Sequence, residues 1–418
     1  MKKINKLGIL LTVLLLFVSL CSCAAVDPVP DQATDGTEQT AATDAESADD
    51  TATAYGYQSL KTDAERAFYE TFGDFVRRGE AEPLRVDYTD DVERLTRISE
   101  MYCYDHPEVF WVDSTESIRY VTDGASYLEI TVPFSLTGAA LESAQGELET
   151  AVKTAVATVP VGASDFEKEC AINDYLVDHV TYNEAAAASP QFAVGNEHNA
   201  YGALVEGSCV CDGYACAYKL LSDRLGMDSC IIFGSAVNRS GSNEFHAWNC
   251  VKLEGEWYHL DVTWNAASDQ TVPAVGRYLN LNMTTQQATQ ERTILPLDGD
   301  PAAQEENVLY NYFVPDCTAT KYNYIRYKYD LLSSDEDFSV VENGLTDAAQ
   351  RDEEYYCFRV DNGLDYDGVY QSLISYEMAS MVERINAGGT LERPLRASTY
   401  LYSEPTNRLI MIQLAYED

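Results

Sequence analysis

The strongest constraint on this chain is the order of three chemically distinctive side chains within residues 207–264. Cys211 stands in GSCVCDGYA, His246 in FHAWN and Asp261 in EWYHLDVTW, at separations of 246 − 211 = 35 and 261 − 246 = 15 residues. Hydrophobic periodicity predicts a helix at about residues 214–225 and strands at 229–237, 246–253 and 257–264. Because the Glu-Gly pair at 254–255 is a tight-turn signal, we expect His246 and Asp261 on neighbouring strands at similar heights.

These residue types in this order can carry out nucleophilic chemistry. A thiol attacks a carbonyl as its thiolate, and a helix N-terminus lowers a thiol pKa through its unpaired N–H groups and dipole. Cys211 lies at the entrance of the predicted helix, and Gly213 allows close backbone approach there. An imidazole must accept the thiol proton, and a third group must hold the imidazole. We therefore expect His246 to face Cys211 while Asp261 accepts a hydrogen bond from the other ring nitrogen.

The three segments resemble the transglutaminase-like superfamily, and the resemblance covers about residues 165–265. It implies an α+β fold with a papain-like core, in which a helix bearing the cysteine packs on an antiparallel sheet bearing the histidine and the aspartate. It also implies that Cys211 is the nucleophile, His246 the general base and acid, and Asp261 the orienting carboxylate. The reaction implied is attack on an amide, a thioester intermediate, and its release by an amine or by water.

Two aromatic residues are further candidates in this site. The oxyanion would be met by the Cys211 backbone N–H and a second donor, for which Tyr201 is our candidate. Trp248, two residues after the histidine, is expected to pack over the site and limit water. His259 lies two residues before Asp261, and we expect it to pack or lie at the surface.

The N-terminal segment predicts export. Three lysines precede an apolar run at residues 7–20 that is shorter than the about 20 residues of a membrane span. The sequence LCSC at 20–23 resembles the lipobox of bacterial lipoproteins, which implies cleavage after residue 22 and lipidation of Cys23. A simple cleaved signal or an anchor helix is the alternative.

Acidic residues dominate the charge of the chain. The 68 Asp and Glu against 28 Lys and Arg give a net charge of −40, which argues against nucleic acid as a partner and against binding to anionic lipid headgroups. Residues 24–57 hold eight acidic residues and no basic one. Such a stretch cannot bury enough apolar surface to order itself, so it predicts a disordered tether.

The remaining sequence predicts a helical region and a second folded unit. We expect helices at about residues 60–78, 90–104, 136–156, 164–180 and 371–385, and hairpins at 117–133 and 399–414. The last unit holds 14 of the 29 tyrosines, which suits half-buried strands or a binding surface. The expected domains are a signal peptide (1–22), the lipidated cysteine and tether (23–57), a helical region with a hairpin (58–160), the transglutaminase-like catalytic domain (161–300) and a Tyr-rich α+β domain (301–418).

The other cysteines permit several interpretations. Without Cys21, Cys23 and Cys211 there are 11 − 3 = 8 thiols, which allow up to four disulfides, or none in a reducing habitat. Cys209 is expected in the core or in a disulfide, because it should point away from Cys211. A metal site on these two would need further soft ligands, such as Cys216 with Cys230 or His198. Since the sequence has no zinc-like CxxC pair, we expect no metal and no cofactor.

Together these features predict a cysteine enzyme, lipid-anchored at the extracytoplasmic face of the cell membrane. Its partners would be the membrane, through the lipid anchor, and a protein or peptide amide substrate, with cell-envelope amides among the candidates. Hydrolysis is expected over transamidation, because many bacterial relatives look like peptidases. The alternative is a non-catalytic envelope binding or assembly lipoprotein that keeps the fold as a scaffold, although a scaffold needs none of the three site residues.

Overall fold

The computed structural model describes residues 53–79, 82–86, 92–112, 119–121, 128–188, 195–237, 242–272, 274–297, 311–396 and 400–417. The predicted signal peptide, Cys23 and most of the tether lie outside these ranges. Residues 48–418 form one compact unit. Within the described ranges, no helix combines the length and the apolar character needed to cross a membrane.

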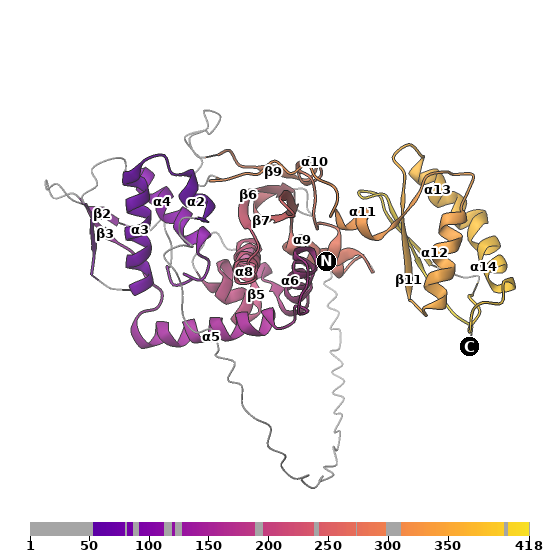
Figure 1. Cartoon of the computed structure of the whole chain (residues 1–418), viewed down its shortest axis with the longest axis horizontal. Helices are drawn as coiled ribbons and strands as arrows, with labels where there is room; N and C mark the ends of the chain where they lie inside the picture. Colours follow the sequence, from indigo (N-terminus) through magenta and orange to yellow (C-terminus); the bar gives the residue numbers. More distant parts are fainter. Residues whose placement is uncertain are drawn as a thin grey trace, which may run out of the picture. The chain divides into compact units, whose positions relative to one another are not determined.

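The first part of the described chain is mainly helical, with a small antiparallel sheet of order β1-β3-β2 on one side of α3 (Figure 1). Its elements are α2 (Tyr55–Ser59), α3 (Asp63–Arg78), β1 (Leu84–Val86), α4 (Val92–Asp105), β2 (Arg119–Val121), β3 (Leu128–Thr131) and α5 (Gly138–Val156). A capping box between Thr62 and Glu65 starts α3, and left-handed Gly79 ends it. These elements confirm the predicted helices and hairpin, whereas β1 was not predicted. Helix α2 begins at Tyr55, two residues before the predicted end of the tether.

The central part consists of helices packed on an antiparallel sheet of order β8-β7-β6-β9. Helix α8 contacts β6 and β7 and is buried along most of its length (Figure 1). The elements are α6 (Asp165–His179), β4 (Thr181–Tyr182), α7 (Glu184–Ala187), the short helices η2 (Asn196–His198) and η3 (Gly202–Glu206), β5 (Ser208–Cys209), α8 (Cys211–Arg224), β6 (Ser229–Val237), β7 (Asn243–Leu253), β8 (Glu256–Leu260), α9 (Val262–Asp269), η4 (Gly276–Tyr278), α10 (Thr285–Ala288) and β9 (Arg292–Ile294).

Two predictions about this part are wrong in detail. Helix α8 begins at Cys211 itself and not at residue 214, so the thiol belongs to the first turn. Strand β8 ends at Leu260, and Asp261 is the N-cap of α9 rather than a strand residue. Its side chain accepts a hydrogen bond from the backbone N–H of Trp264 at 3.0 Å. Aspartate is among the best N-cap residues, so it stops the strand and starts a helix within the predicted strand 257–264.

The last part has its own sheet, of order β10-β11-β13-β12. The elements are α11 (Tyr324–Lys328), β10 (Asp330–Leu332), α12 (Ser339–Gln350), β11 (Tyr355–Val360), α13 (Tyr366–Ser372), η5 (Leu373–Glu377), α14 (Met378–Ala387), β12 (Tyr400–Glu404) and β13 (Leu409–Gln413). Helices α12 and α14 share one apolar core with this sheet (Figure 1). The predicted final hairpin is confirmed, and the predicted helix at 371–385 is part of a longer run that starts at α13.

Two main apolar cores follow from this arrangement. The larger one contains buried residues from Leu60 to Leu281, and the smaller one residues from Leu332 to Leu414. The larger core therefore includes side chains from both sides of residue 160. The domain limits at residues 160 and 300 stay predictions.

One carboxyl group of α6, that of Glu169, is buried in the protein with no cationic side chain bonded to it among the described residues. Glu169 is fully buried, its Oε2 accepts a hydrogen bond from Asn282 Nδ2 at 2.7 Å, and its Oε1 has no partner among the described residues. Burial raises the pKa of Glu169 to about 8, against the weaker opposing effect of the Asn282 hydrogen bond. The group is therefore mostly protonated at neutral pH.

Replacing Glu169 with Gln should change the pH dependence of stability. An unfolded Glu titrates near about 4.3, so between that pH and about 8 the folded chain holds a proton that the unfolded chain has lost. Stability thus falls as pH rises through this window, and Glu169→Gln should remove the fall. We expect the variant to be more stable at pH 8 by on the order of 3 kcal/mol and similar to the parent at pH 4, measured by urea unfolding. Glu142→Gln, at an exposed position of α5, is the control. A difference that stays constant between the two pH values would contradict the burial argument.

Candidate active site

The first turn of α8 holds Cys211 close to two neighbouring segments. The backbone N–H of Val210 donates to Glu197 O at 2.9 Å, which ties the residue before the cysteine to η2. A Cβ on Gly213 would lie 2.5 Å from Cys209 Cβ and 2.7 Å from Glu197 O. Only glycine fits this close approach, so the Gly213 of the sequence motif has a direct packing reason.

The Cys211 thiol is buried beside strand β7. Cys211 is 7% exposed, α8 packs on β7, the strand of His246, and the dipoles of the backbone N–H groups of Ala247 and Asp212 favour the thiolate. Burial raises the pKa of the Cys211 thiol well above its ordinary value, and the negative charge of Asp212 adds to the rise. The two backbone donors oppose this only in part. The helix N-terminus therefore does not produce the lowered thiol pKa that we expected, because desolvation outweighs it.

His246 and Asp261 meet directly, as the sequence predicts. His246 Nε2 donates to Asp261 Oδ2 at 2.7 Å, and the exposed fractions are 6% for His246 and 0% for Asp261. The bond occupies Nε2, so Nδ1 is the ring nitrogen left to exchange a proton with a thiol. The carboxylate reaches the histidine from the start of α9 rather than from the neighbouring strand.

A buried arginine completes the environment of Asp261. Arg292 of β9 donates to Asp261 Oδ2 from Nε at 2.9 Å and from Nη2 at 2.7 Å, and its side chain is 1% exposed. Its Nη2 also donates to Asn280 Oδ1 at 3.0 Å, while Asn280 O accepts the backbone N–H of Asp261. Burial alone would raise the pKa of Asp261, but the charges of His246 and Arg292 and their hydrogen bonds outweigh it and hold that pKa well below its ordinary value.

The indole rings of Trp248 and Trp264 lie beside His246, and that of Trp264 also contacts Arg292. The His246 ring lies 5.8 Å from the Trp248 ring at an interplanar angle of 22°, and 5.7 Å from the Trp264 ring. Arg292 Cζ lies 3.8 Å above the Trp264 ring, a cation–π contact. A Cβ on Gly234 would lie 2.6 Å from Trp248 Cη2, so the glycine opposite His246 in the sheet makes room for the indole.

Two other residues near the cysteine have partners of their own. The Tyr201 hydroxyl donates to a carboxylate oxygen of Glu147 on α5, and its ring stacks on Phe110. A phenol has one proton to donate, and here Glu147 accepts it. The oxyanion role of Tyr201 therefore stays a prediction. His198 Nδ1 donates to Asp212 Oδ2 at 2.9 Å. Although burial lowers it, the hydrogen bond and charge of Asp212 raise the pKa of His198 above its ordinary value.

Comparison with known proteins agrees with this geometry. Residues 153–262 match the model of the transglutaminase-like superfamily. This part of the chain belongs to that superfamily. It carries Cys211, His246 and Asp261, and the antiparallel sheet with α8 packed on it confirms the predicted α+β transglutaminase-like fold.

Two curated relatives and two solved structures are similar to parts of the chain. Kyphoscoliosis peptidase of Homo sapiens and that of Mus musculus are each 29% identical to it over 123 residues, which is 28% of this chain and 18% of the relative. The chain thus spans less than a fifth of these relatives. A crystal structure of a TGase shares 16% identity over 33% of this chain and 40% of its own, with a TM-score of 0.26. A proposed cysteine protease from Cytophaga hutchinsonii shares 14% over 35% of this chain and 61% of its own, with a TM-score of 0.22.

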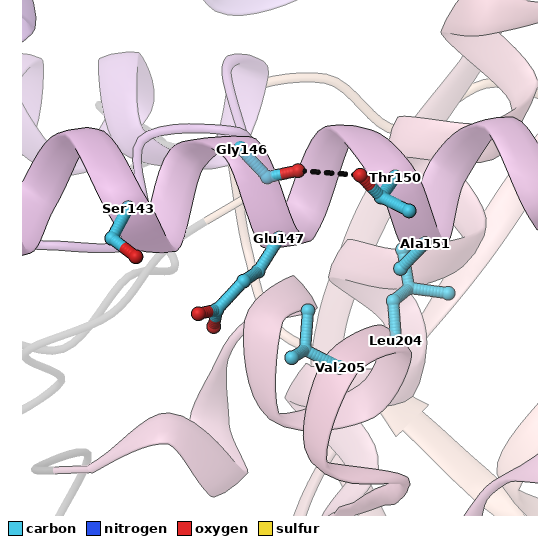
Figure 2. A pocket seen from close by; sticks show the side chains of 7 residues that line it. All are labelled: Ser143, Gly146, Glu147, Thr150, Ala151, Leu204 and Val205. Atoms are coloured by element: carbon cyan, nitrogen blue, oxygen red, sulfur yellow. Dashed lines mark hydrogen bonds between the residues drawn. The ribbon is translucent and has the colours of Figure 1, made fainter.

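A surface pocket lies beside the transglutaminase-like domain's π-helical turn η3, away from the three site residues. It has a volume of about 500 Å³ and is lined by Ser143, Gly146, Glu147, Thr150, Ala151, Leu204 and Val205 (Figure 2). Its polar groups are one carboxylate, two hydroxyls and backbone, and the Thr150 hydroxyl is bonded to Gly146 O at 2.8 Å (Figure 2). None of the lining residues is Cys211, His246 or Asp261.

The cysteines of the described residues agree with two of the outcomes that the sequence left open. All nine cysteines within the described residues are free thiols, and Cys209 is buried in the core. The metal set that we considered around Cys209 and Cys211 is not brought together. Within the described ranges, one group could hold a metal ion: Cys250, His259 and Cys317, whose donor atoms all lie within 4.8 Å of one another. His259 is fully buried and not at the surface.

Sequence reasoning missed Arg292 and this cysteine group. Arg292 stands 31 residues after Asp261 in a three-residue strand, and no local pattern links the two. Cys250 and His259 could have been found from the hairpin. In a hairpin whose tight turn is at residues 254–255, residue 250 lies directly opposite residue 259. The structure has this register.

Removing the arginine charge should destabilise the domain in a pH-dependent way. Arg292→Met leaves the Asp261 carboxylate buried beside one partner fewer, which typically costs about 3–5 kcal/mol. The native pKa of Asp261 is depressed, so its favourable contribution is present above the unfolded value of about 3.9 and is lost as pH falls through the folded value. Without Arg292, burial raises the pKa of Asp261, so the folded variant takes up a proton as pH falls and regains part of its lost stability; the gap to the parent therefore narrows between pH 7 and pH 4 in urea unfolding.

The matched control is Arg277→Met. Arg277 also pairs with aspartates, Asp269 and Asp178, but its side chain is 26% exposed, and partly exposed ion pairs contribute about 1 kcal/mol or less. Equal losses of unfolding free energy in the two variants would contradict a role of Arg292 in compensating Asp261. So would a difference between Arg292→Met and the parent that does not change with pH.

The pH dependence of Cys211 alkylation should follow its raised pKa. Iodoacetamide reacts with the thiolate, so labelling of Cys211 in the folded chain should be slow at pH 7 and still rising above about pH 8.5, where ordinary thiols ionise. Peptide mapping by mass spectrometry separates Cys211 from Cys209. The same chain in urea, where the thiol is solvated, is the reference. Labelling of the folded chain that levels off below pH 8 would show instead a preformed thiolate.

Proposed function

We propose that this chain is a cysteine enzyme that attacks protein or peptide amides through a thioester at Cys211. The observation that carries the proposal is the hydrogen bond from His246 Nε2 to Asp261 Oδ2, with Cys211 buried at the start of α8, the helix that packs on the strand of His246. A buried thiol, an imidazole with Nδ1 available and an ionised orienting carboxylate form the set that thiol-dependent acyl transfer requires.

In the proposed reaction His246 accepts and donates each proton that moves. His246 Nδ1 takes the thiol proton as sulfur attacks the amide carbon, and the oxyanion accepts the backbone N–H of Cys211 at the start of α8. The imidazolium then donates its proton to the leaving amine, and a thioester remains. Water or a second amine, deprotonated by the same imidazole, attacks the thioester and restores the thiol.

The raised thiol pKa determines when the first proton moves. A thiol that is protonated at rest is activated by His246 as a general base once a substrate is bound, and not as a preformed ion pair. Asp261 supports this because it stays ionised and stabilises the imidazolium that forms. Hydrolysis, deamidation and transamidation share these steps and differ in the group that resolves the thioester.

The site of action and the partners form part of the same proposal. Lipidation at Cys23 would hold the enzyme at the extracytoplasmic face of the membrane, where cell-envelope peptides are among the accessible amides. The competing proposal is a non-catalytic envelope lipoprotein that keeps the fold as a scaffold. The deep burial of Cys211, which is 7% exposed, and its raised pKa are the observations that favour this competitor.

Amide turnover by the full chain decides between the two. A pool of glutamine-containing peptides is incubated with the chain and a primary amine, and products are read by mass spectrometry as cleavage, as deamidation or as amine adducts. We expect at least one of these products from the parent. Cys211→Ala should lower the rate by at least about 1,000-fold, since the nucleophile cannot be replaced by water.

Cys209→Ala is the matched control, because it removes a buried thiol two residues away and leaves the nucleophile. Its rate should stay within a few-fold of the parent. Full turnover by the Cys211→Ala chain would exclude the thioester. A parent chain that converts none of the peptides, while Cys211 is still alkylated at high pH, would favour the scaffold.

A further inference from the structure

We propose that Cys230, Cys250, His259 and Cys317 form a binding site for a soft divalent cation, Zn²⁺ in particular, behind the catalytic histidine. The site is distinct from the Cys211 chemistry and goes beyond the proposed function. Three of its residues already converge: Cys250, His259 and Cys317 place their donor atoms within 4.8 Å of one another and are 0–1% exposed. Two thiols and an imidazole are ligands that Zn²⁺ prefers.

The antiparallel register explains why these residues meet. Cys230 of β6 is the cross-strand partner of Cys250 of β7, and Cys250 is the partner of His259 of β8. Directly opposed side chains share one face of a sheet, so three donors form a row across three strands. Cys230, Cys250 and Cys317 also pack in one small buried cluster, which makes Cys230 the candidate fourth donor.

The distances match a tetrahedral site closely. With Zn–S bonds of about 2.3 Å, two sulfurs of a tetrahedron are about 3.8 Å apart, and Cys250 Sγ lies 3.8 Å from Cys317 Sγ. Cys250 Sγ lies 3.0 Å from His259 Nδ1. A tetrahedral S–N edge is about 3.5 Å, so insertion of the ion requires this pair to open by about 0.5 Å.

The surroundings of His259 fix the nitrogen that would bind the metal. Trp248 Nε1–H donates to His259 Nδ1 at 3.1 Å, so Nδ1 carries a lone pair and Nε2 carries the proton. Nε2 lies 3.2 Å from the Thr285 hydroxyl, to which it donates. Metal-binding histidines commonly hold their second nitrogen in this way. On metal binding the Trp248 N–H turns to a thiolate sulfur.

The segment that carries Cys317 is attached at the same point. The backbone N–H of Cys317 donates to Thr285 Oγ1 at 3.2 Å, and the backbone N–H of Thr285 donates to Cys317 O at 2.8 Å. Thr285 thus positions both a sulfur ligand and the imidazole. Zn²⁺ replaces the protons of three thiols, so three protons are released per ion and the site carries a net charge of −1.

The metal would stabilise the wall of the active site. Trp248 contacts His259 on one side and stacks on His246 on the other. An ion that joins β6, β7, β8 and the Cys317 segment would hold this indole, and with it the histidine, in a fixed place. Folding stability is the first property that it should change, because metal binding to the folded state alone adds to the unfolding free energy.

Cobalt titration of the full chain tests the site without reference to amide turnover. The chain is reduced, stripped with a chelator and titrated with Co²⁺. We expect one equivalent to give a thiolate-to-cobalt charge-transfer band with tetrahedral d–d absorption, which one equivalent of Zn²⁺ removes. About three protons should be released per ion, and the thermal midpoint should rise by several degrees. The absence of a band in the parent chain would overturn the proposal.

Variants assign the band to these residues. Cys317→Ser and His259→Gln should each weaken Co²⁺ binding by at least about 100-fold. Cys357→Ser, which removes a buried thiol from β11, should leave it unchanged, as should Cys211→Ala. A band that survives in Cys317→Ser, or one that is lost in Cys357→Ser, would place the metal elsewhere. If Cys317→Ser does not fold, the titrations of the parent and of His259→Gln still decide whether the ion binds at this site.

Discussion

The ion pair between Arg292 and Asp261 is the interaction on which the site depends. A carboxylate with no solvent exposure is costly unless its charge is compensated, and here one oxygen, Oδ2, receives three N–H groups from Arg292 and His246. The other oxygen, Oδ1, caps α9 through the Trp264 N–H. One side chain therefore starts a helix, orients an imidazole and joins β9 to the sheet, so the fold and the site form together.

Burial works in opposite directions on the two ionisable ends of this site. At Asp261 the interactions with His246 and the charge of Arg292 outweigh desolvation, and the carboxylate stays charged. At Cys211 two backbone donors do not outweigh it, and the thiol stays protonated. The difference lies in the partners, because a full positive charge offsets burial far better than peptide dipoles do. A thiol that is protonated at rest reacts slowly with small oxidants and electrophiles, so the proposed reaction depends on His246 taking the proton during attack.

Local sequence patterns predicted most helices and strands, and a motif predicted the three site residues. The helix predicted from residue 164 starts where expected, because the capping box between Ser164 and Glu167 acts within one turn. Predictions failed where a single residue overrides periodicity: Asp261 ends a run of strand-forming residues because its side chain caps a helix. Arg292 could not be predicted, because its role arises only when β9 pairs with β6, more than 50 residues earlier in the chain. Cys250 and His259 could have been paired from the hairpin turn alone.

Asp261 uses one oxygen for His246 and the other to cap α9, and this double role affects which residues are retained in evolution. Because the residue is needed for folding as well as for orienting His246, selection for a stable chain retains it, together with Arg292, whether or not the chemistry is used. The Cys211 side chain neither caps a helix nor pairs with a charged group among the described residues. In a relative that does not carry out the proposed reaction, drift should therefore reach the thiol first, while the aspartate and its arginine persist.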